Sequence, residues 1–267
     1  MSGKTVAAIS SWVMRGTIGL RAIGFVLERR GHTVWSVPTV TLPWHPGLGP
    51  STKAPQEVLP AQLGELAANP HALDGILTGY FVSAEQVMAA AAFIDAVRRV
   101  REDVCVLVDP IIGDEAGRYV PAAVASAIMA ELVPRADVIT PNINELAELS
   151  GGKTMSDAKR LAPSTVVVTS AAATPEALST WVVTKSATTT LTHPRIDAPA
   201  RGTGDLFSGL FMALCVEGRP PVEAARIALA ATYRVVKGSG PVSLALTTHQ
   251  EALISQDVSA VLVDGPA

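Results

Sequence analysis

The stretch "RGTGDLFSGLFMALC", Arg201 to Cys215, places two glycines and one aspartate directly before a long apolar run. The run predicts a buried helix that begins near Gly204. Glycine lets the backbone turn tightly and approach a ligand closely, and the free N–H groups and positive dipole end of a helix N-terminus attract anions. We therefore expect Gly202, Thr203 and Gly204 to form an anion site suited to phosphate.

Asp205 lies in the same turn, beside the expected phosphate. A carboxylate there can accept a proton from a hydroxyl group that attacks phosphorus. The alternative is that Thr203 or Asp205 only caps the helix. Capping alone would not require the flanking glycines, so the pattern favours a catalytic Asp205.

The rest of the chain alternates short β-branched runs with Ala- and Leu-rich helical stretches. Strands are expected at 5–10, 32–40, 75–79, 104–110, 137–142, 165–170 and 181–185, and helices at 18–30, 84–100, 121–132, 143–150, 204–217 and 221–237. This alternation predicts a three-layer α/β fold, with a mostly parallel central sheet and helices on both faces. Ligands of such folds bind at the carboxyl ends of the strands.

Composition limits the class of protein. The chain has 267 residues, of which 48% are hydrophobic and 17% charged, with a net charge of −3. We expect one domain over residues 1–267, and no nucleic-acid or anionic-membrane surface, which would need clustered Lys and Arg. Cys105 and Cys215 lie among apolar neighbours and are expected to be reduced thiols. No apolar run suggests a signal peptide or a membrane span, so we expect a cytoplasmic protein.

Residues 41–55, "TLPWHPGLGPSTKAP", interrupt the alternation. Their prolines and glycines cannot continue a helix or a central strand. A long connection of this kind is often a lid over a site, and an exposed surface loop is the alternative.

Two more polar clusters follow expected strands. Asp109 and Asp114 lie in "VDPIIGDEAGRYVP", and Asn142 and Glu145 lie in "ITPNINELAEL". Acidic groups at neighbouring strand ends could hold Mg²⁺. Asn142 and Glu145 also match an N-cap with a capping box, which stays open as their alternative role. Asp109 closes a very apolar strand and must find a partner.

Thr169 and Ser170 end the strand "TVVVTS", where their hydroxyls could bond a phosphate or begin a turn. Near the N-terminus, Gly16, Gly19 and Gly24 do not have the G-x-G-x-x-G spacing, and no acidic residue closes the second strand. This argues against a nicotinamide oxidoreductase. The same loop could bring Ser10 or Ser11 to a pocket.

Taken together, these segments resemble the pyridoxal kinases of the ribokinase-like superfamily. "GTGD" resembles the superfamily signature, and "DPIIGDEAGRYVPAAV" with "VPRADVITPNINELAELSG" is similar to the family's nucleotide and magnesium segments. "LTGYFVSAEQV" and "HTVWSVPTVTL" point to pyridoxal kinases in particular. The resemblance runs from about residue 5 to residue 240.

The resemblance implies roles for individual residues. Asp205 would be the general base toward the 5′-hydroxyl group of pyridoxal, and the amides of residues 202–204 would stabilise the transferring phosphoryl group. Asp109 and Glu145 would organise Mg²⁺ through water. The remaining expected contacts are Asp109, Asp114, Asn142, Glu145, Thr169 and Ser170 toward ATP, and Ser11, Thr39, Tyr80 and Asp205 toward the vitamer. ATP as co-substrate and a homodimer are implied as well, with a monovalent cation as an open point.

The substrate side departs from the family pattern. The N-terminal loop is commonly like "SHVVYGHVGN", whereas here Trp12, Arg15 and Thr17 replace a His, a Tyr and a His. The lid keeps His45 and Gly49 of a "TVQLSNHTQYG"-like segment. A kinase for hydroxymethylpyrimidine or another small alcohol is therefore one alternative, although hydroxymethylpyrimidine kinases usually have a cysteine at the position of Asp205. A non-catalytic vitamer-binding protein is the alternative of another class.

Overall fold

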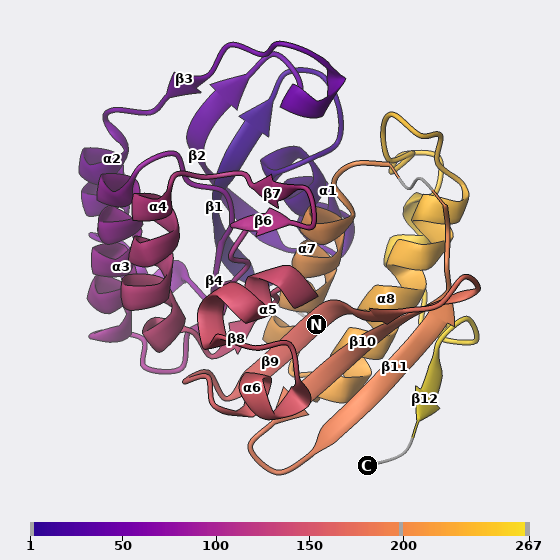
Figure 1. The fold of residues 1–267 in the computed structure, drawn as a ribbon. Helices are drawn as coiled ribbons and strands as arrows, with labels where there is room; N and C mark the ends of the chain where they lie inside the picture. Colours follow the sequence, from indigo (N-terminus) through magenta and orange to yellow (C-terminus); the bar gives the residue numbers. More distant parts are fainter. Residues whose placement is uncertain (1–2, 198–199, 265–267) are drawn as a thin grey trace.

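The computed structural model describes residues 3–197 and 200–264 of the chain (Figure 1). A ten-stranded sheet runs in the order β12-β11-β10-β9-β8-β5-β4-β1-β2-β3. Its strands are β1 (Thr5–Val13), β2 (Thr33–Leu42), β3 (Ala54–Pro55), β4 (Gly75–Thr78), β5 (Cys105–Val108), β8 (Val138–Ile139), β9 (Thr165–Ala173), β10 (Ala177–Thr184), β11 (Thr188–Pro194) and β12 (Leu262–Asp264). Neighbours from β9 to β2 pair in parallel, and the outer strands at both edges pair antiparallel. The prediction of a mostly parallel sheet is confirmed.

Helices cover both faces of this sheet (Figure 1). One face carries α1 (Leu20–Arg29), α7 (Thr203–Val216) and α8 (Pro221–Lys237). The other face carries α2 (Leu59–Leu66), α3 (Ala84–Arg98), α4 (Ala122–Ala127), α5 (Ile143–Ser150) and α6 (Met155–Lys159). The three-layer prediction is therefore confirmed.

Successive strand residues feed two separate hydrophobic cores. On β1, Val6 and Ala8 join the core beneath α1, α7 and α8, whereas Ala7 and Ile9 join the opposite core, and all four are fully buried. Side chains alternate between the faces of a strand, so a strand covered on both faces must be apolar at every position. This is why these strands show no polar alternation in the sequence.

Helix α7 fixes the turn that precedes it. Every residue from Leu206 to Leu214 is buried, which is typical of a helix enclosed on all sides. Truncation of a side chain such as that of Leu210 would cost about 2–5 kcal/mol of unfolding free energy. The sequence "RGTGD" is thus held at the end of a rigid element.

Several elements were not predicted. Helices α2 and α6, strands β3, β11 and β12, and a small hairpin of β6 (Gly113–Asp114) and β7 (Gly117–Arg118) are additions. The expected helix 121–132 divides into α4 and a π-helical turn, Ile128–Leu132. Within residues 41–55, β2 continues to Leu42, a 3₁₀ turn spans Pro46–Leu48, and β3 pairs with β2.

Both thiols are free and half-buried. A hydrogen bond with Cys105, together with burial, raises the pKa of the Cys215 thiol. A protonated thiol is unreactive, in keeping with the expected reduced state. In the part of the chain described, no helix has the length and apolar character needed to cross a membrane.

Candidate active site

The turn before α7 is built around glycine. Gly202 has φ +95°, and a Cβ atom there would lie 2.6 Å from the carbonyl oxygen of Thr17 and 2.7 Å from Cγ2 of Ile18. A Cβ on Gly204, by contrast, would meet nothing within 4 Å. Gly202 is therefore required by its conformation and by the N-terminal loop packed against it, whereas Gly204 presents open space to a ligand.

The N-cap of α7 is Gly202, and no side chain caps this end of the helix within the described residues. The alternative in which Thr203 or Asp205 only caps the helix is therefore wrong. The first N–H groups of α7 remain available, as an anion site requires.

Asp205 occupies the first turn of α7. Burial raises the pKa of its carboxyl group to about 6, although a hydrogen bond from the Gly19 backbone opposes this shift. Gly19 itself has φ +56°, and a Cβ there would lie 2.2 Å from the carbonyl oxygen of Ser11. The loop after β1 thus presses Gly19 between Ser11 and Asp205, which brings two of the predicted site residues to one place.

Asp109 follows β5 and is 7% exposed. Its backbone N–H donates to the Thr78 carbonyl at 2.9 Å, and its Oδ2 accepts from Ser208 Oγ at 2.8 Å. Burial raises the pKa of Asp109 well above its usual value, and the charges of Glu145 and Asp205 add to the shift. The partner that this buried carboxylate required is therefore Ser208, on the same helix as Asp205.

Asn142 and Glu145 form the capping box of α5. The Asn142 side chain accepts from the N–H groups of Asn144 and Glu145, and Glu145 Oε2 accepts from the Asn142 N–H at 2.9 Å. Glu145 Oε1 accepts from the Ile112 N–H at 2.8 Å, and Asn142 Nδ2 donates to the Gly113 carbonyl at 2.8 Å. The capping alternative is confirmed, and the pair also fastens the segment after Asp109 to α5.

A divalent cation suits the carboxylates gathered here. Burial raises the pKa of Glu145, as it does for Asp109 and Asp205, and like charges at these positions destabilise one another. No group of three or more His, Cys, Asp or Glu residues among those described is close enough to enclose a metal. Mg²⁺ keeps several of its waters and needs only one or two carboxylates besides substrate phosphates, so Asp109 and Glu145 fit it through water.

The hairpin after Asp109 holds Asp114, which accepts from the Tyr119 hydroxyl and from the Ala116 N–H. The strand expected to end at Thr169 and Ser170 continues as β9 to Ala173, so both residues lie within the strand and that expectation is wrong. The Thr169 N–H donates to the Pro141 carbonyl at 2.9 Å. Ser170 is exposed and has φ +49°, a strained conformation for a residue other than glycine. The segment after β8 therefore meets the middle of β9 through an isolated bridge between Asn142 and Thr169.

The predicted vitamer-side residues are also neighbours. Thr39 Oγ1 donates to the Tyr80 carbonyl at 2.7 Å, and Ser10 Oγ accepts from the Tyr80 N–H at 3.1 Å. Thr39 is fully buried, and its proton is committed to holding Tyr80. Lys53 Nζ donates to the Tyr80 hydroxyl at 2.8 Å and lies 5.4 Å from the ring centroid. Residues 41–55 thus reach the site through Lys53.

Sequence reasoning missed Ser208 and Lys53. Ser208 lies one helical turn after Asp205 in an apolar run, a placement that could have marked it as the partner of a strand-end carboxylate. Lys53 is the one lysine of residues 41–55, but its contact with Tyr80 depends on how that segment folds.

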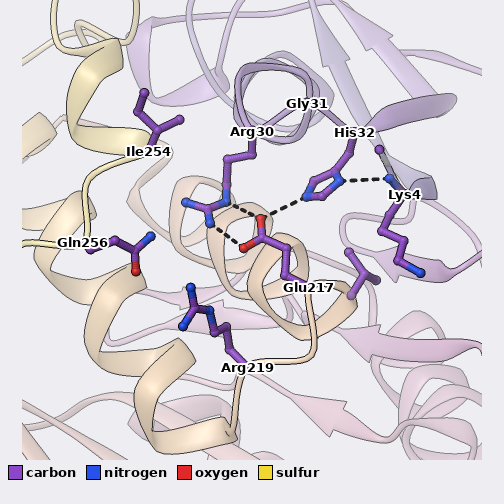
Figure 2. A pocket seen from close by; sticks show the side chains of 10 residues that line it. Lys4, Arg30, Gly31, His32, Glu217, Arg219, Ile254 and Gln256 are labelled. Atoms are coloured by element: carbon purple, nitrogen blue, oxygen red, sulfur yellow. Dashed lines mark hydrogen bonds and ion pairs between the residues drawn. The ribbon is translucent and has the colours of Figure 1, made fainter. Parts of the chain in front are cut away.

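An open pocket of about 510 Å³ lies elsewhere, at the amino ends of β1 and β2 (Figure 2). Arg30 and Glu217 line it as a nearly buried ion pair, and His32 Nε2 lies 3.1 Å from Glu217. His32 Nδ1 accepts from the Lys4 N–H. None of the predicted site residues lines this cavity, so its size does not make it the reaction site.

Together, an uncapped helix N-terminus with a carboxylate in its first turn, on a mostly parallel sheet, fits one class of protein, the small-molecule kinases with the ribokinase-like architecture. The sequence model of the phosphomethylpyrimidine kinase family matches residues 31–248. Pyridoxal kinase PdxY of Deinococcus radiodurans is 31% identical over 258 residues, covering 87% of this chain and 86% of the relative. The pyridoxine/pyridoxal/pyridoxamine kinase of Bordetella avium is 36% identical over 220 residues, covering 76% and 74%.

Solved structures agree with this match. Pyridoxal kinase from Leishmania donovani in complex with ADP and pyridoxamine superimposes with a TM-score of 0.89 at 26% identity, covering 99% of both chains. The chain therefore belongs to the phosphomethylpyrimidine kinase family and, within it, to the pyridoxal kinases. The expected family and fold are confirmed.

Proposed function

We propose that this protein transfers the γ-phosphoryl group of ATP to the 5′-hydroxymethyl group of pyridoxal, giving pyridoxal 5′-phosphate for vitamin B6 salvage. The observation that carries the proposal is Asp205, whose carboxyl group lies in the first turn of α7 with a pKa raised to about 6. A base of this pKa is ionised at neutral pH and still accepts a proton readily. The curated relatives named as pyridoxal kinases support the same reaction.

The proposed chemistry depends on position and electrostatics. Asp205 removes the proton from the 5′-hydroxyl group as its oxygen attacks phosphorus. The N–H groups of Gly202, Thr203 and Gly204 donate to the phosphoryl oxygens, where negative charge is concentrated. Because these donors are held rigidly by α7, they need little reorganisation during the reaction.

Mg²⁺ belongs to this proposal as the ion that neutralises the ATP phosphates. Asp109 and Glu145 would hold it through water. Ser208 orients Asp109, and three backbone and side-chain bonds fix the hairpin that faces Glu145. Asp114, Asn142, Thr169 and Ser170 are proposed to lie along the ATP phosphates and nucleotide. The resemblance alone supports a monovalent cation, which exchange of K⁺ for Na⁺ in the assay would test.

On the vitamer side we propose Ser11, Thr39, Tyr80 and Asp205 as contacts, with residues 41–55 as a lid within a single domain of residues 1–267. The contact between Lys53 and Tyr80 supports the lid. Pyridoxine and pyridoxamine are included as substrates because the Bordetella avium relative is named for all three vitamers.

A hydroxymethylpyrimidine kinase is the second candidate, favoured by the description of the matching family. The aspartate at position 205 argues for pyridoxal, since the pyrimidine kinases usually have a cysteine there. A vitamer-binding protein without activity is disfavoured because the "GTGD" turn is complete.

The test is ADP release from ATP and Mg²⁺ with pyridoxal, pyridoxine, hydroxymethylpyrimidine and ribose supplied in parallel. Release with pyridoxal is the expected result. Release with hydroxymethylpyrimidine alone would keep the chemistry and transfer the assignment to the second candidate. Binding of pyridoxal without ADP release from any of the alcohols would favour the binding protein.

Assembly and location complete the proposal. The family resemblance supports a homodimer, which light scattering of the purified chain would test. Two free thiols are in keeping with a reducing cytoplasm, and cell fractionation would test that location.

A further inference from the structure

Arg201 stands directly before the anion site and was not assigned a role from the sequence. Its side chain is exposed. Arg195 and Arg219 pair with Asp197 and Glu223, whereas the Arg201 guanidinium has no carboxylate partner among the residues of the described structure. A cation without a partner at this position is available to a ligand.

Contacts with the lid place this guanidinium. A Cβ atom on Gly47 would lie 3.7 Å from Arg201 Nε and 2.8 Å from His45 Nδ1. His45 Nδ1 accepts from the Gly47 N–H at 2.9 Å. The 3₁₀ turn of residues 46–48 therefore rests against Arg201, with the His45 ring folded back over Gly47.

Electrostatic effects agree with this placement. Burial lowers the pKa of His45, and the positive charge of Arg201 adds to the effect. Burial and the bond to Asp114 raise the pKa of Tyr119, and Arg201 opposes that shift. Arg201 thus lies among the lid, the β6–β7 hairpin and the turn at 202–204. The hairpin carries Asp114, which is proposed to lie along the ATP phosphates, and the turn is the proposed anion site.

We propose that the Arg201 guanidinium binds the γ-phosphoryl oxygens of ATP beside the anion site, positioned there by His45 and Gly47 of the lid. Arginine suits this role because its planar fork can donate two parallel hydrogen bonds to phosphate. Its positive charge would also offset part of the negative charge of the triphosphate. The inference rests on the proposed function and adds a catalytic residue to it.

Nucleotide binding tests the proposal without requiring turnover. Calorimetry in Mg²⁺ compares ADP with an ATP analogue whose β,γ-bridge is an imido group, for the wild type, Arg201→Gln, Arg201→Lys and His45→Ala. Arg219→Gln, at the opposite end of the sheet, is the matched control. Because Arg201 is exposed, its substitutions should leave the unfolding midpoint unchanged.

For Arg201→Gln we expect at least tenfold weaker binding of the ATP analogue and less than twofold weaker binding of ADP. Turnover should fall about 10²–10³-fold, the usual effect of losing one preorganised donor. Arg201→Lys should have an affinity for the ATP analogue between those of the wild type and Arg201→Gln, because lysine keeps the positive charge but cannot donate two parallel hydrogen bonds. His45→Ala should weaken the binding of the ATP analogue more than the binding of ADP.

Equal losses for both nucleotides, or no loss for either, would overturn the contact with the γ-phosphate. An unchanged analogue affinity in His45→Ala would overturn the part played by the lid. If the wild type itself binds neither nucleotide, the proposed kinase function fails, and this outcome is distinct from failure of Arg201 alone.

Discussion

Ser208 Oγ donates a 2.8 Å hydrogen bond to Asp109 Oδ2 and thereby joins helix α7 to the end of strand β5. Thr140 Oγ1 lies 3.1 Å from the same Ser208 hydroxyl, and both hydroxyl-bearing residues are buried. Asp205 lies in the first turn of the same helix. The proposed base and the proposed magnesium-binding carboxylate are therefore fixed relative to each other by one side chain.

Replacing Ser208 with Ala should damage the site more than its size suggests. The change leaves a buried carboxylate oxygen without its donor, which costs about 1–3 kcal/mol of unfolding free energy. Chemical denaturation of Ser208→Ala measures this loss, and Mg²⁺ dependence of turnover should shift to higher concentration. Thr140→Val removes the hydroxyl that contacts Ser208 but leaves the bond between Ser208 and Asp109, so it should lower the free energy of unfolding less. Equal effects of the two variants would show that Asp109 does not depend on Ser208.

The two glycines of the turn should respond differently to alanine. Gly202→Ala must force a Cβ against the Thr17 carbonyl at φ +95°, so it should destabilise the protein by at least 1 kcal/mol. Gly204→Ala meets no protein atom, and alanine favours a helix over glycine by up to about 1 kcal/mol. Gly204→Ala should therefore keep its stability and lose turnover, because its methyl group enters the space proposed for phosphate. Full activity of a stable Gly204→Ala protein would contradict this use of the turn.

The dependence of turnover on pH should follow Asp205. Its pKa is raised from 3.8 to about 6, mainly by burial, and a general base acts only when ionised. Turnover should therefore fall as the pH decreases through about 6, with the slope of one proton, well above the pH at which an ordinary aspartate titrates. A pH profile at saturating substrate measures this. A profile that stays flat down to pH 5 would exclude Asp205 as a base with this pKa.

The same shift has a consequence for stability that works in the opposite direction from most acidic groups. Folding raises the pKa of Asp205, so the folded state binds its proton more tightly than the unfolded state does. The protonated Asp205 therefore favours folding below about pH 4, and this contribution to the free energy of unfolding is lost as the pH rises through about 6. Asp205→Asn should accordingly be more stable than the wild type at pH 7, with the difference vanishing below pH 4. Thermal unfolding at the two pH values provides the comparison.

Lys53 should affect the vitamer more than the nucleotide. It donates to the Tyr80 hydroxyl from the lid, so Lys53→Met loses this tie while keeping much of the stem. We expect a severalfold higher KM for pyridoxal and an unchanged KM for ATP. Steady-state kinetics with each substrate varied in turn separates the two constants. Lys153→Met, which breaks a bond to Asn144 on α5, is the control. A change confined to the KM for ATP would contradict the proposed role of Lys53 in vitamer binding.

The sequence was sufficient for the parallel core and for most strand-end residues because burial on both faces leaves a direct mark on composition. Val6 to Ile9 must all be apolar, whichever face they meet. The outer strands do not need an apolar residue at every position, so their composition identifies them less clearly. β11, "TTTLTHP", is mostly polar, with Leu191 as its one aliphatic residue, and it pairs only at the antiparallel edge of the sheet, so it was not predicted.

The site was predictable where backbone conformation dictates residue type, and less so where contacts cross the fold. The turn at Gly202 and the capping box of Asn142 and Glu145 could be expected from local spacing. The bond between Ser208 and Asp109 spans 99 residues, and the contact of Lys53 with Tyr80 depends on the path of a proline-rich segment. Local spacing marks Ser208 only as a polar residue in an apolar run and does not identify Asp109 as its partner, and it gives no signal for the contact of Lys53.

The most direct test of the account compares phosphoryl transfer to pyridoxal by the wild type and by Asp205→Asn, with nucleotide affinity measured on the same samples. We expect the wild type to form pyridoxal 5′-phosphate. We also expect a loss of roughly 10²–10⁴-fold in turnover for the variant, the usual share of a positioned general base, at unchanged affinity for ADP. A variant that transfers phosphate at close to the wild-type rate would contradict the central claim, because Asp205 would then not be the base.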